Sequence, residues 1–130
     1  FIDVHFALTL AAIDAPEAGE LYASLAKYGE DGNDDNAPIS AEIGKPLAAG
    51  LIAYKQGDFG AAVDYMVPVR YALPKMGGSN AQRDLFAMIL LDAAIRAGRA
   101  NLARALAAER LGRMPENAWT RAAHTRAFAA

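Results

Sequence analysis

The feature that most constrains this chain is a pattern of small residues, a glycine turn and a proline stop that occurs twice. Gly57 lies in the first turn, and Gly98 lies in the second, 41 residues later. Each glycine separates two helix-forming segments, and the second segment ends at Pro74 in the first copy and at Pro115 in the second. Because glycine and proline both interrupt helices, the pattern predicts two helical hairpins.

Small residues stand where the two helices of each hairpin must cross. Gly50 and Ala62 take these places in the first copy, and Ala103 takes one in the second. Only a small side chain lets two helix backbones approach closely, and Asp58 after the turn is well placed to cap the second helix. The order and spacing resemble a tetratricopeptide repeat, whose hairpins stack into a right-handed superhelix.

The remaining segments extend the same organisation. We interpret Asp14–Glu17 as the N-cap and first turn of a helix that runs to Tyr28. The acidic stretch Glu30–Pro38 is predicted to be an exposed loop. Pro68 lies within an apparent helix over 59–73, which it is expected to kink.

The sequence therefore predicts an all-α fold, a right-handed array of antiparallel helical hairpins with about seven helices in a single domain. The composition agrees, since 31 of the 130 residues are Ala. The expected hairpins span about 1–29, 39–74 and 79–113, and a capping helix spans 116–130.

A more specific resemblance rests on three segments in the second half of the chain: Gly77–Phe86 (GGSNAQRDLF), Ala97–Arg99 (AGR) and Ala103–Arg110 (ARALAAER). Together with the upstream Asp3–Leu8 and the Leu51–Phe59 turn region, they resemble the C-terminal part of the tetratricopeptide repeat protein 38 family. The resemblance implies a helical-repeat protein with no established enzymatic activity, and it suggests a fragment of a longer chain.

Composition and charge exclude several classes of function. The chain has no Cys, which rules out disulfides and cysteine-ligated metals. It has no apolar run of the roughly 18–20 residues that cross a bilayer and no signal peptide, so we expect a cytoplasmic protein without a membrane partner. The Arg residues are scattered on a chain of acidic pI without interleaved aromatics, which disfavours nucleic acid.

The charge is unevenly divided along the chain. Residues 1–65 carry eleven acids and three bases, and residues 66–130 carry ten bases and four acids. The simplest interpretation is solvated helix faces with local ion pairs. The alternative is a dipolar module that docks end-on against an oppositely charged surface, including another copy of itself, and the oligomeric state stays open.

The candidate functional surface is the groove lined by the first helix of each hairpin. Helical periodicity assigns five side chains to it: Leu51, Tyr54, Lys55, Asp92 and Arg96. The mixture of apolar and basic residues is suited to an acidic peptide segment or one with a free C-terminal carboxylate. The occupant is then a partner protein or the rest of the same chain.

A second candidate is the segment that begins the helix after Gly77–Gly78. Ser79 and Gln82 have the spacing of a capping box, which gives the motif a structural explanation. The alternative is a small anion held by the free amides of this helix start, with Ser79, Gln82 and Arg83 around it.

No catalytic centre or cofactor is indicated. Asp3 and His5 point in different directions on a helix and are too few for a metal site, so His5 is expected to be buried and hydrogen-bonded. We therefore expect a non-enzymatic protein-interaction scaffold. The alternative is part of an enzyme whose active site lies mainly in residues outside this sequence, with His5 or the segment 78–83 contributing.

Overall fold

The computed structural model describes residues 1–129, and within this range the chain forms helices joined by turns and loops, with no strand. This confirms the predicted all-α class. In chain order the segments are α1 (Ile2–Ala12), α2 (Glu17–Asp31), α3 (Asn36–Ile39), the π-helical η1 (Ser40–Gly44), α4 (Lys45–Lys55), α5 (Phe59–Met66), the 3-10 helix η2 (Leu73–Met76), α6 (Asn80–Arg96), α7 (Ala100–Arg113) and α8 (Ala118–Ala129).

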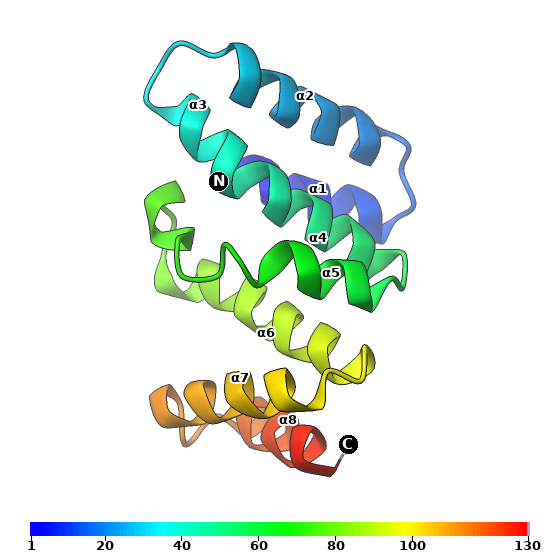
Figure 1. Cartoon of the computed structure of the whole chain (residues 1–130), viewed down its shortest axis with the longest axis vertical. Helices are drawn as coiled ribbons and strands as arrows, with labels where there is room; N and C mark the ends of the chain where they lie inside the picture. The colour runs from blue at the N-terminus through cyan, green and yellow to red at the C-terminus, as the bar shows by residue number, and fades with distance from the viewer. Residues whose placement is uncertain (130) are drawn as a thin grey trace.

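The helices lie in a stack, with α2 at the top, α4, α5 and α6 following one another below it, and α7 and α8 at the bottom (Figure 1). Within the stack α1 packs on α2, α4 on α5, and α6 on α7, each pair being joined by a short connection. Neighbouring pairs meet where α1 contacts α4 and where α5 contacts α6. The last helix, α8, packs on α7 and also reaches α6, so it covers the end of the stack.

The turn between α4 and α5 forms as its sequence predicts. Gly57 has a φ of +82°, a conformation that side chains other than glycine rarely adopt. The Asp58 carboxylate accepts a hydrogen bond of 2.9 Å from the amide of Ala61, which caps α5. Gly50 faces the crossing, where an added Cβ would lie 2.5 Å from the Cγ of Met66 and 3.2 Å from the carbonyl oxygen of Ala62.

The acidic loop is shorter than predicted. α2 continues to Asp31, and α3 begins at Asn36 and runs without a break through η1 into α4. Asp34 makes the early start possible, because its carboxylate accepts hydrogen bonds from the amides of Asn36 and Ala37. Ala37, which the sequence placed in the exposed loop, is buried within α3. The loop itself consists of residues 32–35.

Asp14 does not cap α2, so that part of the prediction was wrong. Its φ is +53°, and its amide bonds to the carbonyl of Ala11, which makes Asp14 part of the turn that ends α1. The residue at the start of α2 is instead Pro16, which provides no side-chain cap. Asp tolerates the left-handed conformation better than most residues, which explains its place in the turn.

Pro68 ends α5 rather than kinking a longer helix, so the expected helix over 59–73 is corrected. α5 stops at Met66, and residues 67–72 continue as turns into η2. Proline has no amide hydrogen to donate to the carbonyl four residues earlier, and its ring clashes with that carbonyl. α5 therefore has 8 residues, against 14 in α7.

Candidate functional site

Asp92 is the centre of a polar cluster that connects three helices. Asp92 lies on α6 and is only 8% exposed, yet it is surrounded by donors. Its Oδ2 accepts hydrogen bonds of 2.7 Å from the Tyr54 hydroxyl on α4 and from the Nε of Arg96. Its Oδ1 accepts a 3.3 Å hydrogen bond from the Nη1 of Arg126 on α8. We call Tyr54, Asp92, Arg96 and Arg126 the Asp92 cluster.

Positive charge exceeds negative charge at this cluster. Two guanidinium groups, both about half exposed, meet the one carboxylate. The ammonium of Lys55 lies 5.9 Å from the centre of the Tyr54 ring and adds a third cation. The Arg96 guanidinium also lies 5.0 Å from the ring centre of Phe59, so an aromatic surface positions it.

The environment of Tyr54 changes its acidity. Burial raises the pKa of Tyr54 above its ordinary value, because it disfavours the charged phenolate. The hydrogen bond to the Asp92 carboxylate and the negative charge of that carboxylate raise it further. Arg96 and Arg126 act in the opposite direction. The Tyr54 hydroxyl is therefore held as a neutral donor to Asp92.

The five groove residues predicted from the sequence have different places in the structure. Tyr54, Asp92 and Arg96 come together in the cluster, and Lys55 is exposed beside it. Leu51 is fully buried in the core, so no peptide reaches it on the folded protein. Arg126 was not predicted, because only the packing of α8 against α6 brings it to Asp92.

Ser79, Gln82 and Arg83, the predicted anion site, are bonded to neighbouring residues. Ser79 and Gln82 form the capping box, with the Ser79 hydroxyl accepting from the Gln82 amide and the Gln82 side chain accepting from the Ser79 amide. The Arg83 guanidinium donates to the carbonyls of Gly77 and Gly78. All three side chains thus hold the start of α6 in place.

His5 is half-buried between two aromatic rings. Its ring centre lies 4.7 Å from that of Phe1 and 4.9 Å from that of Phe86, and its Nδ1 is 3.3 Å from the carbonyl oxygen of Phe1. Asp3 is exposed. Within residues 1–129 no three His, Cys, Asp or Glu residues are arranged to hold a metal ion.

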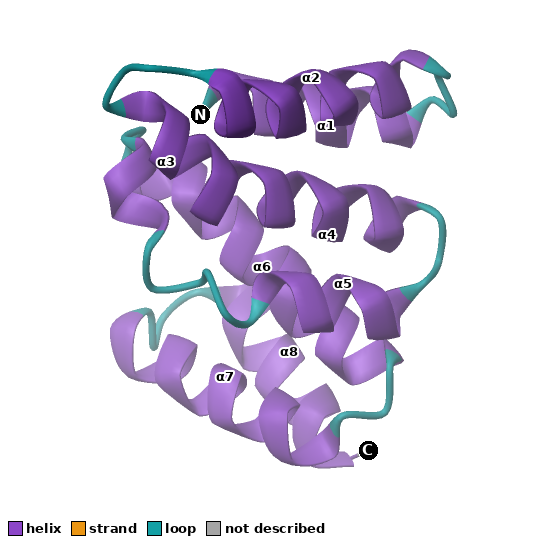
Figure 2. Cartoon of the chain, turned by 45° about the horizontal axis from the view of Figure 1, so that its top comes forward, coloured by secondary structure: helices purple, strands orange, loops and turns teal. Residues whose placement is uncertain are grey.

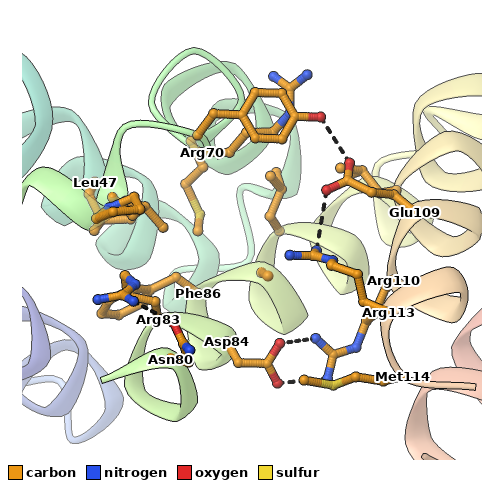
Figure 3. Close-up of a pocket in the computed structure, with 17 residues that line it drawn as sticks. Leu47, Arg70, Asn80, Arg83, Asp84, Phe86, Glu109, Arg110, Arg113 and Met114 are labelled. Atoms are coloured by element: carbon orange, nitrogen blue, oxygen red, sulfur yellow. Dashed lines mark hydrogen bonds and ion pairs between the residues drawn. The ribbon is translucent and has the colours of Figure 1, made fainter. Parts of the chain in front are cut away.

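A cavity of about 450 Å³ lies among α4, α5, α6, α7 and the connection after α5 (Figure 3). Apolar side chains from each of these four helices line it: Leu47, Met66, Phe86, Leu90 and Leu106. Leu90 and Asp92 are two residues apart on α6, so they point to nearly opposite sides of that helix. The cavity and the Asp92 cluster therefore lie on different sides of α6.

A buried ion pair forms one wall of the cavity. Arg110 on α7 is 3% exposed and bonds to both carboxylate oxygens of Asp84 on α6 (Figure 3). Its Nε donates a 3.0 Å hydrogen bond to the hydroxyl of Thr120 on α8, which is fully buried. Nothing local in the sequence links Asp84 to a residue 26 positions away, so the pair was not predicted.

Two further arginines that line the cavity, Arg70 and Arg83, have no carboxylate partner, because both acids of the lining pair with other arginines. Glu109 accepts from the Tyr71 hydroxyl at 2.9 Å and pairs with Arg113 at 3.3 Å. Arg70 donates to the carbonyl of Val67 at 2.6 Å, while its Nε is buried with no hydrogen-bond partner. Arg83 bonds only to neutral oxygens.

Comparison with known proteins does not assign the chain to a family. No protein-family model matches the sequence, and no solved structure matches the fold. Within the described residues no helix has both the length and the apolar character needed to traverse a bilayer.

Proposed function

We propose that the chain is a tetratricopeptide-repeat-like scaffold that binds an acidic segment of a partner protein. The stacked helical pairs support the repeat assignment, as do the glycine turns with positive φ at Gly57 and Gly98 and the tight crossing at Gly50. The resemblance of Gly77–Phe86 to the tetratricopeptide repeat protein 38 family supports the same assignment. A right-handed superhelix and membership of that family are parts of this proposal.

The single observation that carries the binding function is the excess of cations at the Asp92 cluster. Arg96 and Arg126 pair with one carboxylate, and Lys55 lies beside the Tyr54 ring. The three cations come from α6, α8 and α4 respectively. A guanidinium has five N–H donors, and Asp92 engages only one nitrogen of each arginine. The remaining donors suit carboxylates of an acidic segment.

Asp92 has a positioning role in this proposal. By accepting from Tyr54, Arg96 and Arg126 it fixes the two guanidinium groups before a partner arrives, which lowers the entropy cost of binding. The same chemistry suits an acidic segment from elsewhere in the same polypeptide. A neutral or basic segment gains nothing from this surface.

An array of acidic peptides and their Glu-to-Gln counterparts tests the proposal. We expect the wild-type protein to bind acidic peptides at low salt and to lose them as salt rises. The double variant Lys55→Glu with Arg96→Gln should bind at least tenfold more weakly. A matched control, Lys27→Glu with Arg121→Gln, makes the same charge change at exposed residues away from the cluster. Equal binding by both variants would refute the assignment.

A further inference from the structure

The cavity beside α7 exists because α5 is short. In the pair α6 and α7, the second helix has 14 residues, whereas α5 has only 8 because Pro68 ends it. The chain then turns through residues 67–72 to η2 instead of continuing as a helix (Figure 2). A volume of about 450 Å³ is left, lined by Arg70 and Tyr71 from this connection.

The interior of the cavity is suited to an apolar molecule. Ala87, Leu106 and Met114 present accessible apolar surface to it, and the buried Leu47, Met66 and Phe86 lie behind them. Specific small-molecule sites have volumes of roughly 300–1,000 Å³ and mainly apolar walls. At roughly 30 Å³ per water-sized group, the cavity has room for about 15 non-hydrogen atoms.

The charged residues around the cavity leave a net positive charge. Four arginines line it, together with Asp84 and Glu109. Asp84 is paired with Arg110 and Glu109 with Arg113, so each acid is neutralised within the protein. Arg70 and Arg83 stay without a carboxylate, and the buried Nε of Arg70 has no partner. A guanidinium that has no carboxylate within the protein can take one from a ligand.

We propose that this cavity binds a small organic acid with an apolar body, such as a carboxylate of about ten carbons. The hydrocarbon body packs on Ala87, Leu106 and Met114, and the carboxylate accepts hydrogen bonds from Arg70. The site is separate from the Asp92 cluster, so it does not depend on the proposed partner binding.

Calorimetric titration with decanoate and with neutral decanol, both below their aggregation limits, tests the charge requirement. We expect decanoate to bind one site and decanol to bind more weakly. Arg70→Gln should weaken decanoate about tenfold or more and leave decanol unchanged, because only the carboxylate uses the guanidinium. Arg70→Lys keeps the charge and should retain most of the decanoate affinity. Equal decanoate affinity in wild type and Arg70→Gln would overturn the proposal.

A second pair of variants tests the location. Leu106→Trp places a large ring in the cavity and should abolish decanoate binding. Leu102→Trp is the control, since Leu102 is also half-buried on α7, one turn earlier, but does not line the cavity. Circular dichroism on each variant identifies those that fold. Unchanged decanoate binding by a folded Leu106→Trp would overturn the proposal, and so would displacement of decanoate by an acidic peptide.

Discussion

The hydroxyl of Tyr54 donates a 2.7 Å hydrogen bond to the Oδ2 of Asp92, a residue 38 positions later on a different helical pair. Asp92 is 8% exposed, so its carboxylate depends on protein donors in place of water. The bond ties α4 to α6, and Arg126 extends the same connection to α8. One buried carboxylate thereby links three successive parts of the stack.

Removing the Tyr54 hydroxyl should destabilise the protein. Tyr54→Phe keeps the ring contact with Phe59 but leaves Asp92 short of one donor. We expect the free energy of unfolding, measured by urea denaturation, to fall by about 1–2 kcal/mol. Tyr65→Phe is the control, since Tyr65 is 47% exposed and should change stability little. Equal losses in the two variants would mean that the bond to Asp92 contributes nothing specific.

Tyr54 should also affect stability at alkaline pH. Its pKa in the folded protein is raised, chiefly by burial, above the value of 10.0 for an unperturbed tyrosine. Between these two pKa values the unfolded chain loses the proton and the folded chain keeps it, so stability is full below pH 10 and falls as pH rises above it. Absorbance titration near 295 nm should show that Tyr54→Phe removes a late-titrating tyrosine. If Tyr54→Phe instead removed a tyrosine that titrates at the ordinary pKa, the raised pKa of Tyr54 would be contradicted.

Breaking the buried ion pair should be costly. Arg110→Met leaves the carboxylate of Asp84 without its two guanidinium bonds and the Thr120 hydroxyl without its donor. Asp84 is partly accessible, with a side-chain exposure of 21%, so we expect a loss near the lower end of the usual range, about 3 kcal/mol. Adding Asp84→Leu should recover part of it, because no unpaired charge remains. Urea denaturation measures the free energy of unfolding of both variants. A double variant that is less stable than Arg110→Met alone would contradict the prediction.

The close crossing of α4 and α5 should reject even one methyl group. Gly50→Ala places a Cβ 2.5 Å from the Cγ of Met66, so Met66 or the helices must move, at a cost of about 1–3 kcal/mol. Gly19→Ala in α2 meets no atom within 4 Å and should stabilise by up to about 1 kcal/mol. Thermal denaturation of the two variants should shift in opposite directions. A shift in the same direction would argue against the tight crossing.

Local chemistry made part of this fold predictable. The Asp58 cap, the capping box of Ser79 and Gln82, and the turn at Gly57 depend on residues within three or four positions of one another, which a single sequence displays. Pro68 was recognised as a disturbance, but whether it bends or ends a helix depends on the packing of the following residues.

Long-range partners were not predictable in the same way. The pairing of Asp84 with Arg110 and the approach of Arg126 to Asp92 depend on how α7 and α8 pack against α6. Helical periodicity placed Leu51 and Tyr54 on one groove, because they are three residues apart on the same helix face. In the structure Leu51 is completely buried and Tyr54 only half-buried, since Tyr54 lies at the edge of that face. The cavity has no sequence signature, because it results from the absence of a helical turn.

The binding surface can be located directly by NMR, using backbone amide shifts of the isotope-labelled chain titrated with an acidic ten-residue peptide that has a free C-terminal carboxylate. The account predicts shifts concentrated at Lys55, Arg96 and Arg126, and their loss with the Glu-to-Gln counterpart of the peptide. Shifts concentrated around Arg70 and Glu109, or no shifts at low salt, would contradict the claim that the Asp92 cluster receives an acidic partner.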